Sequence, residues 1–247
     1  MEKVKNLIIG FGKAGKTLAN IFAKKGESTI LIERSNLMYV GTCINVACIP
    51  SKTLENLARE SAHVGGSINE KEARYTEAIN KKKELTAFLR QKKYEAAIAS
   101  GVKVVDGVAS FKDNKTIEVY KDGALIAEFN AERIVIDTGS RPFIPNVEGI
   151  KESKFVYTSE TLMEEDKLPK ELLVMGGGYI GLEFASYYAN FGSKVTIIQD
   201  SNDFIPKEDA EIAELVYASM TNKGIRILKN TKILKVSSSE DKVFLNV

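Results

Sequence analysis

The sequence of 247 residues has few of the side chains on which several classes of function depend. It contains two cysteines, too few for a disulfide scaffold and, alone, too few for a closed tetrahedral zinc site. It contains one histidine, which argues against chemistry that needs several imidazoles. Lys and Arg (35) nearly balance Asp and Glu (33), and the net charge of +2 gives no reason to expect binding to nucleic acid or to a membrane surface.

Long apolar runs are also missing. No run approaches the ~18 residues that a membrane span needs. The first run ends at Gly10 and is too short for the apolar core of a secretory signal, so we expect a cytoplasmic protein. With 44% hydrophobic and 28% charged residues, 18 Gly and only 5 Pro, the composition is that of a globular protein of one large domain or two modest ones.

Four glycines near the N-terminus recur at one fixed offset in the second half of the chain. The two sets are Gly10, Gly12, Gly15 and Gly26, and Gly176, Gly178, Gly181 and Gly192. Each set lies between a short apolar run, typical of a buried parallel strand, and a helical stretch that is followed by a second strand. We therefore predict an α/β protein with two Rossmann-like three-layer ββα nucleotide-binding domains, each with G-x-G-x-x-G at the strand-to-helix turn.

The G-x-G-x-x-G turns predict dinucleotide binding. The first glycine permits the tight turn, the second lets the backbone approach a pyrophosphate, and the third allows close packing of helix and strand. The helix N-terminus also offers unpaired N–H groups to the phosphates. Glu33 ends the second strand of the first copy, where a carboxylate can accept hydrogen bonds from ribose hydroxyls, and Gln199 takes the matching place in the second copy. One such motif is weak evidence, whereas two in matching settings are strong evidence.

Between the two repeats the pattern changes twice. Residues 70–99 carry apolar side chains at helical spacing, which predicts one long helix, whole or broken near Lys92. Its lysines alternate with glutamates, so a solvated face is favoured over a polyanion site. Within residues 102–136 the pattern predicts four strands, at residues 102–111, 116–120, 125–129 and 133–136, with a hairpin turn at Asp122-Gly123. We therefore expect a β-meander inserted in the first nucleotide-binding domain.

Cys43 and Cys48 share a segment punctuated by Gly and Pro, directly after the first repeat. Four residues separate the thiols, near enough to bridge on a helix or a distorted turn. Two buried small hydrophobes, and a metal site with His63 as third ligand, are the alternatives. The setting beside a nucleotide-binding unit suits a redox pair better, so a redox dithiol next to a dinucleotide cofactor is favoured and no bound metal is required.

Together these motifs resemble the FAD-dependent pyridine nucleotide-disulfide oxidoreductases, whose members include glutathione reductase, lipoamide dehydrogenase and mercuric reductase. The motifs are the two Rossmann fingerprints, Cys43-x4-Cys48 with Pro50-Ser51-Lys52, Thr138-Gly139, and Gly176-Gly-Gly-Tyr-Ile-Gly-Leu-Glu183. The resemblance covers essentially the whole chain. The segments 10–19 and 189–196 are most similar to the reactive-chlorine-resistance flavoproteins, a branch associated with reduction of hypothiocyanous acid and, by some accounts, of copper(II).

The resemblance implies a role for each matching residue. The implied FAD site consists of Gly10, Gly12, Ala14, Gly15, Glu33, Thr42, Ala109, Thr138 and Gly139. The implied NAD(P)H site consists of Gly176, Gly178, Tyr179, Ile180, Gly181 and Gln199, with Tyr179 as the gate of the nicotinamide pocket.

The resemblance also implies the catalytic groups. Cys48 would be the charge-transfer thiolate, and Cys43 the interchange thiol that meets substrate. Lys52, also a cofactor contact, would form a pair with Glu183 beside the flavin N5. Electrons would then pass from the nicotinamide through flavin and disulfide to the substrate. Because reactivity needs a thiolate, we expect a lowered pKa for at least one of the two cysteines.

Some residues depart from the family pattern. Val40 and Ala47 stand where the family usually has glycine, which affects the loop that carries the cysteines. Asp200 and Pro206 stand where NADPH enzymes often carry arginine, although Gln199 replaces the acid that favours NADH. The preference between NADH and NADPH therefore stays open.

Family members are about twice this length and form homodimers through a C-terminal domain. We therefore expect an FAD-binding domain at residues 1–147, an incomplete NAD(P)-binding domain at residues 148–247, and no C-terminal dimerisation domain. The favoured function is reduction of a small-molecule oxidant or disulfide, with hypothiocyanous acid as a candidate in oxidative stress, although this portion alone is not expected to be fully active. The alternatives are lipoamide dehydrogenase, glutathione reductase, or mercuric or copper reductase activity, a nucleotide-binding module without turnover, and a metal-handling protein.

Overall fold

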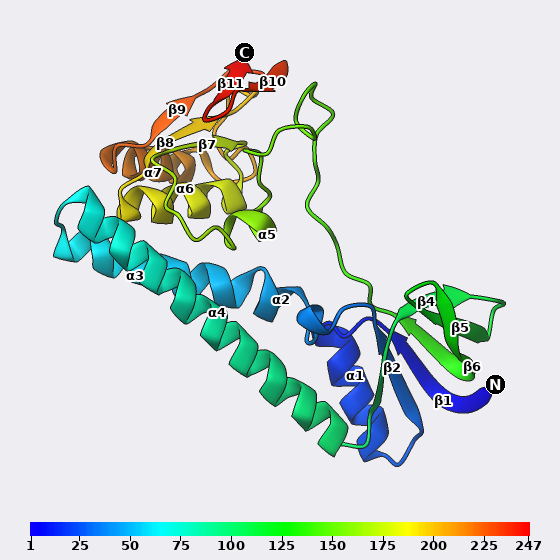
Figure 1. The fold of residues 1–247 in the computed structure, drawn as a ribbon. Helices are drawn as coiled ribbons and strands as arrows, with labels where there is room; N and C mark the ends of the chain where they lie inside the picture. The colour runs from blue at the N-terminus through cyan, green and yellow to red at the C-terminus, as the bar shows by residue number, and fades with distance from the viewer. The chain divides into compact units, whose positions relative to one another are not determined.

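The computed structural model describes all residues from 1 to 247 and divides into two compact units. The first unit holds residues 1–50 and 83–141, and the second holds residues 51–82 and 142–247. Figure 1 labels most helices and strands of both. Neither unit contains a helix that is both long enough and apolar enough to cross a bilayer.

A six-stranded sheet in the order β3-β2-β1-β6-β5-β4 forms the centre of the first unit. Its strands are β1 (Glu2–Ile9), β2 (Thr29–Glu33), β3 (Lys103–Asp106), β4 (Val108–Phe111), β5 (Thr116–Lys121) and β6 (Ala124–Ile136). β1 lies parallel to both β2 and β6, with Leu7 between Ile30 and Ile134. α1 (Lys13–Lys24) connects β1 to β2. The inner strands are apolar runs because a parallel sheet is covered on both faces.

The β-meander predicted for residues 102–136 is built into this sheet. β4, β5 and β6 pair antiparallel, and Asp122 and Gly123 close the hairpin with φ of 50° and 80°, the conformation that Asp-Gly turns favour. The strand expected at residues 102–111 is divided at Gly107, where a Cβ would lie 2.6 Å from Val119 Cγ1. Two further expected strands are instead one, because β6 pairs with β5 along its first half and with β1 along its second half.

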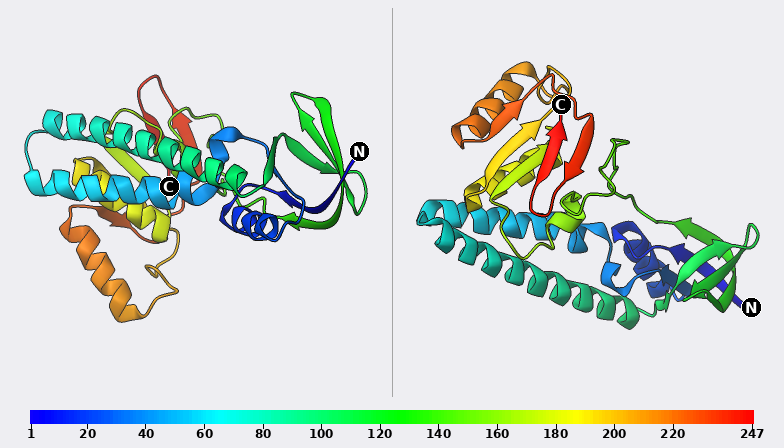
Figure 2. Two further views of the ribbon diagram at one scale, coloured as in Figure 1. Left: turned by 90° about the horizontal axis from the view of Figure 1, so that it is seen from below. Right: turned by 45° about the horizontal axis from the view of Figure 1, so that its top comes forward.

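The second unit contains a three-stranded parallel sheet of β7 (Glu171–Met175), β8 (Lys194–Ile198) and β9 (Arg226–Leu228). α6 (Tyr179–Phe191) and α7 (Ala210–Asn222) connect these strands, and β10 (Lys235–Ser238) pairs with β11 (Val243–Asn246) as a hairpin. Ile197 packs against the residues of α6, whereas its neighbour Ile198 packs against Val236 of the hairpin. The hairpin, sheet and helix therefore form three layers, as predicted (Figure 2).

Two long helices, α3 and α4, lie between α2 and β3 in the sequence. α3 spans Cys48–Val64, and α4 spans Ile68–Ala99 without a break at Lys92, so the predicted helix over residues 70–99 is confirmed. The shorter helices are η1 (Asn36–Met38), α2 (Thr42–Asn45) and α5 (Ser159–Leu162).

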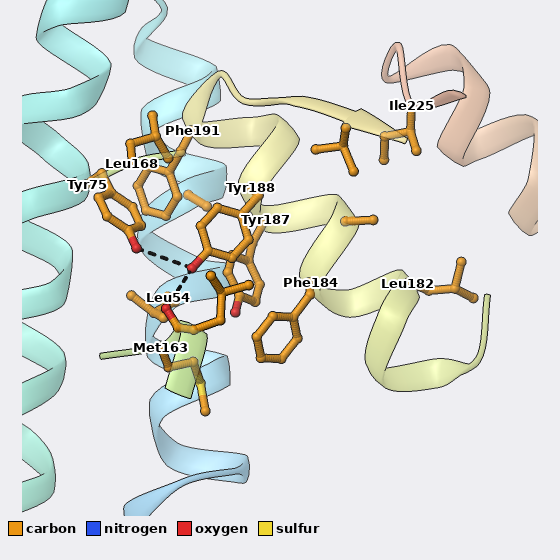
Figure 3. Packing of buried hydrophobic residues seen from close by; sticks show 14 of the residues in the cluster. Leu54, Tyr75, Met163, Leu168, Leu182, Phe184, Tyr187, Tyr188, Phe191 and Ile225 are labelled. Atoms are coloured by element: carbon orange, nitrogen blue, oxygen red, sulfur yellow. Dashed lines mark hydrogen bonds between the residues drawn. The ribbon is translucent and has the colours of Figure 1, made fainter. Parts of the chain in front are cut away.

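Residues 51–82 of the long helices belong to the second unit because their apolar side chains pack against α6. Leu54 and Tyr75 join one buried cluster with Tyr188 and Phe191 (Figure 3). The proposed assignment of residues 1–147 to FAD and 148–247 to NAD(P) concerns cofactor binding rather than packing, so it stays a prediction.

Candidate functional site

The carboxyl ends of β1, β2 and β6 meet at one edge of the first sheet, where the FAD site is predicted. Gly10 follows β1 and donates its N–H to the carbonyl oxygen of Ile32 at 2.8 Å. Asp137 follows β6 and donates its N–H to the carbonyl oxygen of Ile9 at 2.8 Å. The backbone ladder therefore holds the first glycine turn beside the end of β6, at the edge where open α/β sheets bind ligands.

Close approach of backbone explains the glycines of this turn. Gly10 has a φ of 107°, and a Cβ there would lie 2.1 Å from the carbonyl oxygen of Asp137. A Cβ on Gly12 would lie 2.6 Å from Asp137 Oδ2, and one on Gly15 would lie 2.5 Å from the carbonyl oxygen of Gly10. Each position therefore excludes a side chain.

The N-terminus of α1 carries unpaired donors. The N–H of Gly15 donates to Asp137 Oδ2 at 2.7 Å, whereas the N–H groups of Lys13 and Ala14 donate to no acceptor in the protein. Unpaired N–H groups at a helix N-terminus favour an anion. The turn therefore fits the pyrophosphate of a dinucleotide.

Glu33 is buried at the end of β2 and supports the same turn. Its carboxylate accepts hydrogen bonds from the N–H of Phe11 at 2.9 Å and of Ser35 at 3.1 Å. A carboxylate has about four acceptor positions, so two remain for ribose hydroxyls. The residue is thus both a structural clamp on the glycine turn and a fitting ribose ligand.

Gly41 brings the cysteine segment onto this turn. It has a φ of 82°, and a Cβ there would lie 2.6 Å from Gly12 Cα. Thr42 begins α2, and its Oγ1 lies 3.9 Å from the place of a Cβ on Gly139. Val40 takes a left-handed φ of 73°, which glycine adopts without strain. The segment therefore keeps at Val40 a backbone conformation that glycine would favour.

The two cysteine thiols are free, and they lie close enough that Cys48 affects the pKa of Cys43. Cys43 is half-buried in α2, and Cys48 is the exposed first residue of α3. Burial, then the hydrogen bond to Cys48 and the charge of its thiolate, raise the pKa of the Cys43 thiol, and the ammonium of Lys13 partly opposes them. A lowered pKa is thus not found at Cys43. Two neighbouring free thiols can nevertheless be oxidised to a disulfide.

Sequence reasoning missed two residues of this edge. Asp137 directly precedes Thr138-Gly139, and the rule that parallel strands end at one edge would have included it. Asn45 donates from Nδ2 to the carbonyl oxygens of Tyr39 at 2.8 Å and Gly41 at 2.9 Å, while its buried Oδ1 has no hydrogen-bond partner. A buried acceptor without a partner fits a donor supplied by a ligand, and no sequence pattern identifies it.

Ala109 lies two residues after Gly107, whose N–H donates to the carbonyl oxygen of Glu33 at 2.9 Å, so the start of β4 lies beside the end of β2. It lies in β4 opposite Val119 of β5, and its side chain packs against a buried cluster that includes Ile117 and Phe129. Its part in cofactor binding stays a prediction without support from packing.

The second glycine turn repeats this geometry in the second unit. Gly176 has a φ of 98°, and a Cβ on Gly181 would lie 2.2 Å from the carbonyl oxygen of Gly176. Gly178 caps α6 without a side chain, and no atom lies within 4 Å of the place of its Cβ. The N–H groups of Tyr179 and Ile180 donate to no acceptor in the protein. This turn therefore fits a second dinucleotide phosphate.

Tyr179 lies within the second turn, and Gln199 directly follows β8, the next strand. The amide of the buried Gln199 donates to the carbonyl oxygen of Asp203, and a Cβ on Gly177 would lie 2.4 Å from Gln199 Oε1. Tyr179 is exposed, and its hydroxyl donates to Glu208. A hydrogen bond at the surface therefore holds the Tyr179 ring at the start of α6. The role of Tyr179 as the gate of the nicotinamide pocket stays a prediction.

Lys52 and Glu183 form the ion pair that the resemblance implies. Lys52 Nζ lies 2.7 Å from Glu183 Oε1, and Ser51 Oγ donates to the same oxygen at 2.9 Å. The lysine side chain is 65% exposed, so water screens the pair and it contributes little to stability. The arrangement instead fixes the direction of the ammonium.

The chain offers no ready metal centre: no group of three or more His, Cys, Asp or Glu side chains is arranged to hold an ion. His63, weighed as a third ligand, lies in the last turn of α3.

Two glycine turns at the ends of parallel strands, with a thiol pair against the first, define a protein for two dinucleotides and a redox dithiol. The family model for pyridine nucleotide-disulphide oxidoreductases matches residues 4–247, and the chain therefore belongs to this family. The family uses FAD and NAD(P)H, and the predicted membership is confirmed.

The chain is similar to several members of this family. It is 41% identical over 98% of its length to the probable pyridine nucleotide-disulfide oxidoreductase RclA of Escherichia coli K12, and 33% identical over 94% to a mercuric reductase of Lysinibacillus sphaericus. A copper(II) complex of the HOCl-induced flavoprotein disulfide reductase RclA from Escherichia coli has a TM-score of 0.91 and 40% identity, and it covers the whole chain. The chain spans 53%, 42% and 54% of these three relatives, or about half their length.

Proposed function

We propose that this chain is the nucleotide-binding and dithiol portion of an NAD(P)H-dependent FAD disulfide oxidoreductase. The proximity of the free thiols of Cys43 and Cys48, on a segment that packs against the glycine turn of α1, carries the proposal. FAD, when bound, supplies two-electron chemistry that couples hydride from NAD(P)H to a dithiol.

The residues of each unit have separate tasks. In the first, the N–H groups of Lys13 and Ala14 bind the pyrophosphate of FAD, and Glu33 binds its ribose. In the second, the N–H groups at the start of α6 bind the phosphates of NAD(P)H, and Glu183 holds the Lys52 ammonium in place.

The substrate is a small oxidant or a disulfide that meets Cys43. With hypothiocyanous acid, the Cys43 thiolate attacks the oxidant sulfur, a sulfur–sulfur bond forms, and hydroxide leaves and takes up a thiol proton as water. The Cys48 thiolate then attacks Cys43, thiocyanate leaves, and a disulfide remains, so two electrons pass from the thiols to the oxidant. The similarity to an HOCl-induced reductase supports this substrate class. Reduction of Cu(II) is the second candidate, favoured by the copper complex of the same relative.

The whole protein is, in this proposal, a cytoplasmic homodimer that acts against oxidative stress. The HOCl induction of the RclA relative supports the stress role. Sedimentation of the whole protein tests the dimer, and a mass corresponding to a monomer contradicts it.

Flavin spectroscopy tests the proposal. We expect the purified chain to bind FAD and to gain a long-wavelength charge-transfer band on reduction with dithionite. Cys48→Ser should keep the flavin and lose the band, because it removes the thiolate that contacts flavin. Cys43→Ser is the matched control: because its Cys48 thiol cannot form this disulfide, it should keep the flavin and show the band before any reductant is added. A colourless protein, or a band that survives Cys48→Ser, contradicts the proposal.

A further inference from the structure

Asp137 supplies a cap for the N-terminus of α1 from a distant part of the chain. Gly12, the N-cap residue of this helix, has no side chain that could cap it. A Cβ on Gly12 would lie 2.6 Å from Asp137 Oδ2, so the carboxylate stands where the side chain of an N-cap residue would begin. Oδ2 accepts the N–H of Gly15, in the first turn of the helix, at 2.7 Å. A capping side chain makes the same kind of bond, and Asp137 therefore replaces the missing cap.

The Asp137 carboxylate shares this helix end with the phosphates of the proposed cofactor. The N–H groups of Lys13 and Ala14, which fit the pyrophosphate, directly precede that of Gly15 in one helical turn. Asp137 is half-buried, and its carboxylate accepts the Gly15 N–H and forms no ion pair. Its negative charge and the charges of bound phosphates therefore lie at the same helix end, where like charges repel.

The second glycine turn offers a comparison within the same chain. Gly178 caps α6 without a side-chain hydrogen bond, and no atom lies within 4 Å of the place of its Cβ. The N–H of Gly181, which corresponds to Gly15, donates to no acceptor in this chain. Phosphates bound at the second turn of this chain thus face no carboxylate like that of Asp137.

We propose that Asp137 is a specificity-determining residue of the FAD site, whose carboxylate selects a bridged pyrophosphate over phosphates of higher charge. The inference rests on the proposed function, which places the FAD pyrophosphate at the first turn. Both phosphates of FAD are bridged on each side, and each carries a single negative charge. The terminal phosphate of ADP carries about two at neutral pH. The carboxylate therefore disfavours ADP more strongly than FAD, and a dinucleotide is the preferred ligand.

The experiment compares the wild-type chain with Asp137→Asn after removal of bound flavin. Asparagine keeps an oxygen that can accept the Gly15 N–H, and the substitution removes the charge. Quenching of flavin fluorescence measures the affinity for FAD. Displacement of FAD measures the affinity for ADP at the first turn alone. We expect the variant to bind FAD about fivefold and ADP about tenfold more tightly at low salt, and high salt to reduce both gains.

The stability of the flavin-free chain gives a second readout with the opposite sign. A carboxylate stabilises the positive end of a helix dipole, so the Tm of Asp137→Asn without ligand should fall by about 1–3 °C. A residue that only supports the fold would lower stability and affinity together. Tighter binding by a less stable protein therefore identifies the effect of the charge.

Two controls locate the effect at the first turn. Asp122→Asn removes a carboxylate from the hairpin turn between β5 and β6, where asparagine also tolerates the positive φ, and it should leave both affinities unchanged. The affinity of Asp137→Asn for NADH, measured by nicotinamide fluorescence, should equal that of the wild type.

The possible results separate this inference from the proposed function. Equal or weaker FAD binding by a folded Asp137→Asn variant overturns the inference, as does an equal gain for FAD and ADP. If neither protein binds FAD, the proposed function is overturned, and inorganic pyrophosphate then decides the inference. Pyrophosphate should raise the Tm of Asp137→Asn more than that of the wild type, and an equal rise overturns the role of Asp137.

Discussion

Two neighbouring tyrosines on α6 allow the packing of the second unit to be tested with one chemical change. Tyr187 and Tyr188 are both fully buried (Figure 3). The Tyr188 hydroxyl donates to the carbonyl oxygen of Leu162 at 3.1 Å and lies 3.2 Å from the hydroxyl of Tyr75. The Tyr187 hydroxyl is buried and has no hydrogen-bond partner. Removal of the hydroxyl should therefore have opposite effects at adjacent positions.

The magnitudes follow from these contacts. Tyr188→Phe leaves the Leu162 carbonyl without this donor and should destabilise the fold by about 1.5 kcal/mol. Tyr187→Phe removes a polar group that loses its water on folding and gains no partner, so it should stabilise the fold by about 1 kcal/mol. For a chain of this size, 1 kcal/mol moves the Tm by about 2–4 °C. We expect Tm to fall by about 4 °C in the first variant and to rise by about 3 °C in the second.

Thermal and urea unfolding followed by circular dichroism measure both changes. The double variant should lie between the two single variants, because the lost hydrogen bond and the removed unpaired hydroxyl are separate effects. Equal destabilisation by both single substitutions would show that the Tyr187 hydroxyl has a partner in solution, and the reasoning would be refuted.

Two further predictions concern charge. The Lys5 hydrogen bond is the main cause that lowers the pKa of Glu27 from 4.5 to about 2, so this carboxylate stabilises the fold above about pH 4.5 and the contribution is lost as pH falls toward 2. In the Glu27→Gln variant, the midpoint of urea unfolding should change less with pH over that window than in the wild type. An equal pH dependence in the two proteins contradicts the assignment to Glu27. NADH should bind more tightly than NADPH, because neither Gln199 nor Asp200 offers positive charge to a 2′-phosphate at the end of β8. Asp200→Arg should move the ratio of dissociation constants about tenfold toward NADPH in fluorescence titrations, and a wild-type preference for NADPH refutes the reasoning.

Much of the fold follows from local patterns in the sequence. The two glycine sets sit at strand-to-helix turns because backbone atoms there approach within distances that exclude a Cβ, as at Gly10 and Gly181. The helix over residues 70–99 is visible in its spacing, and Asp122-Gly123 forms its hairpin because both residues accept positive φ. Such features depend on neighbours along the chain.

Features that depend on distant partners could not be predicted in this way. β6 is one strand because β5 and β1 bind successive parts of it, and its own sequence shows no sign of either partner. The first half of α4 packs with α6 through Tyr75, although its spacing indicates only that one face is buried. The hydrogen bond of Asp137 to Gly15 likewise joins residues far apart in the sequence.

The candidate site was predicted mainly through motifs. Val40 is a position at which the motif alone does not predict the backbone conformation. A β-branched residue in place of glycine suggests an altered loop, yet Val40 adopts a φ of 73° and Gly41 still packs on Gly12. A bulky residue in that region costs about 1–3 kcal/mol. Burial of the valine side chain in the cluster with Phe11 contributes about 2 kcal/mol in the opposite direction. The backbone is therefore retained because packing offsets the strain, and this balance depends on neighbours that the motif does not contain.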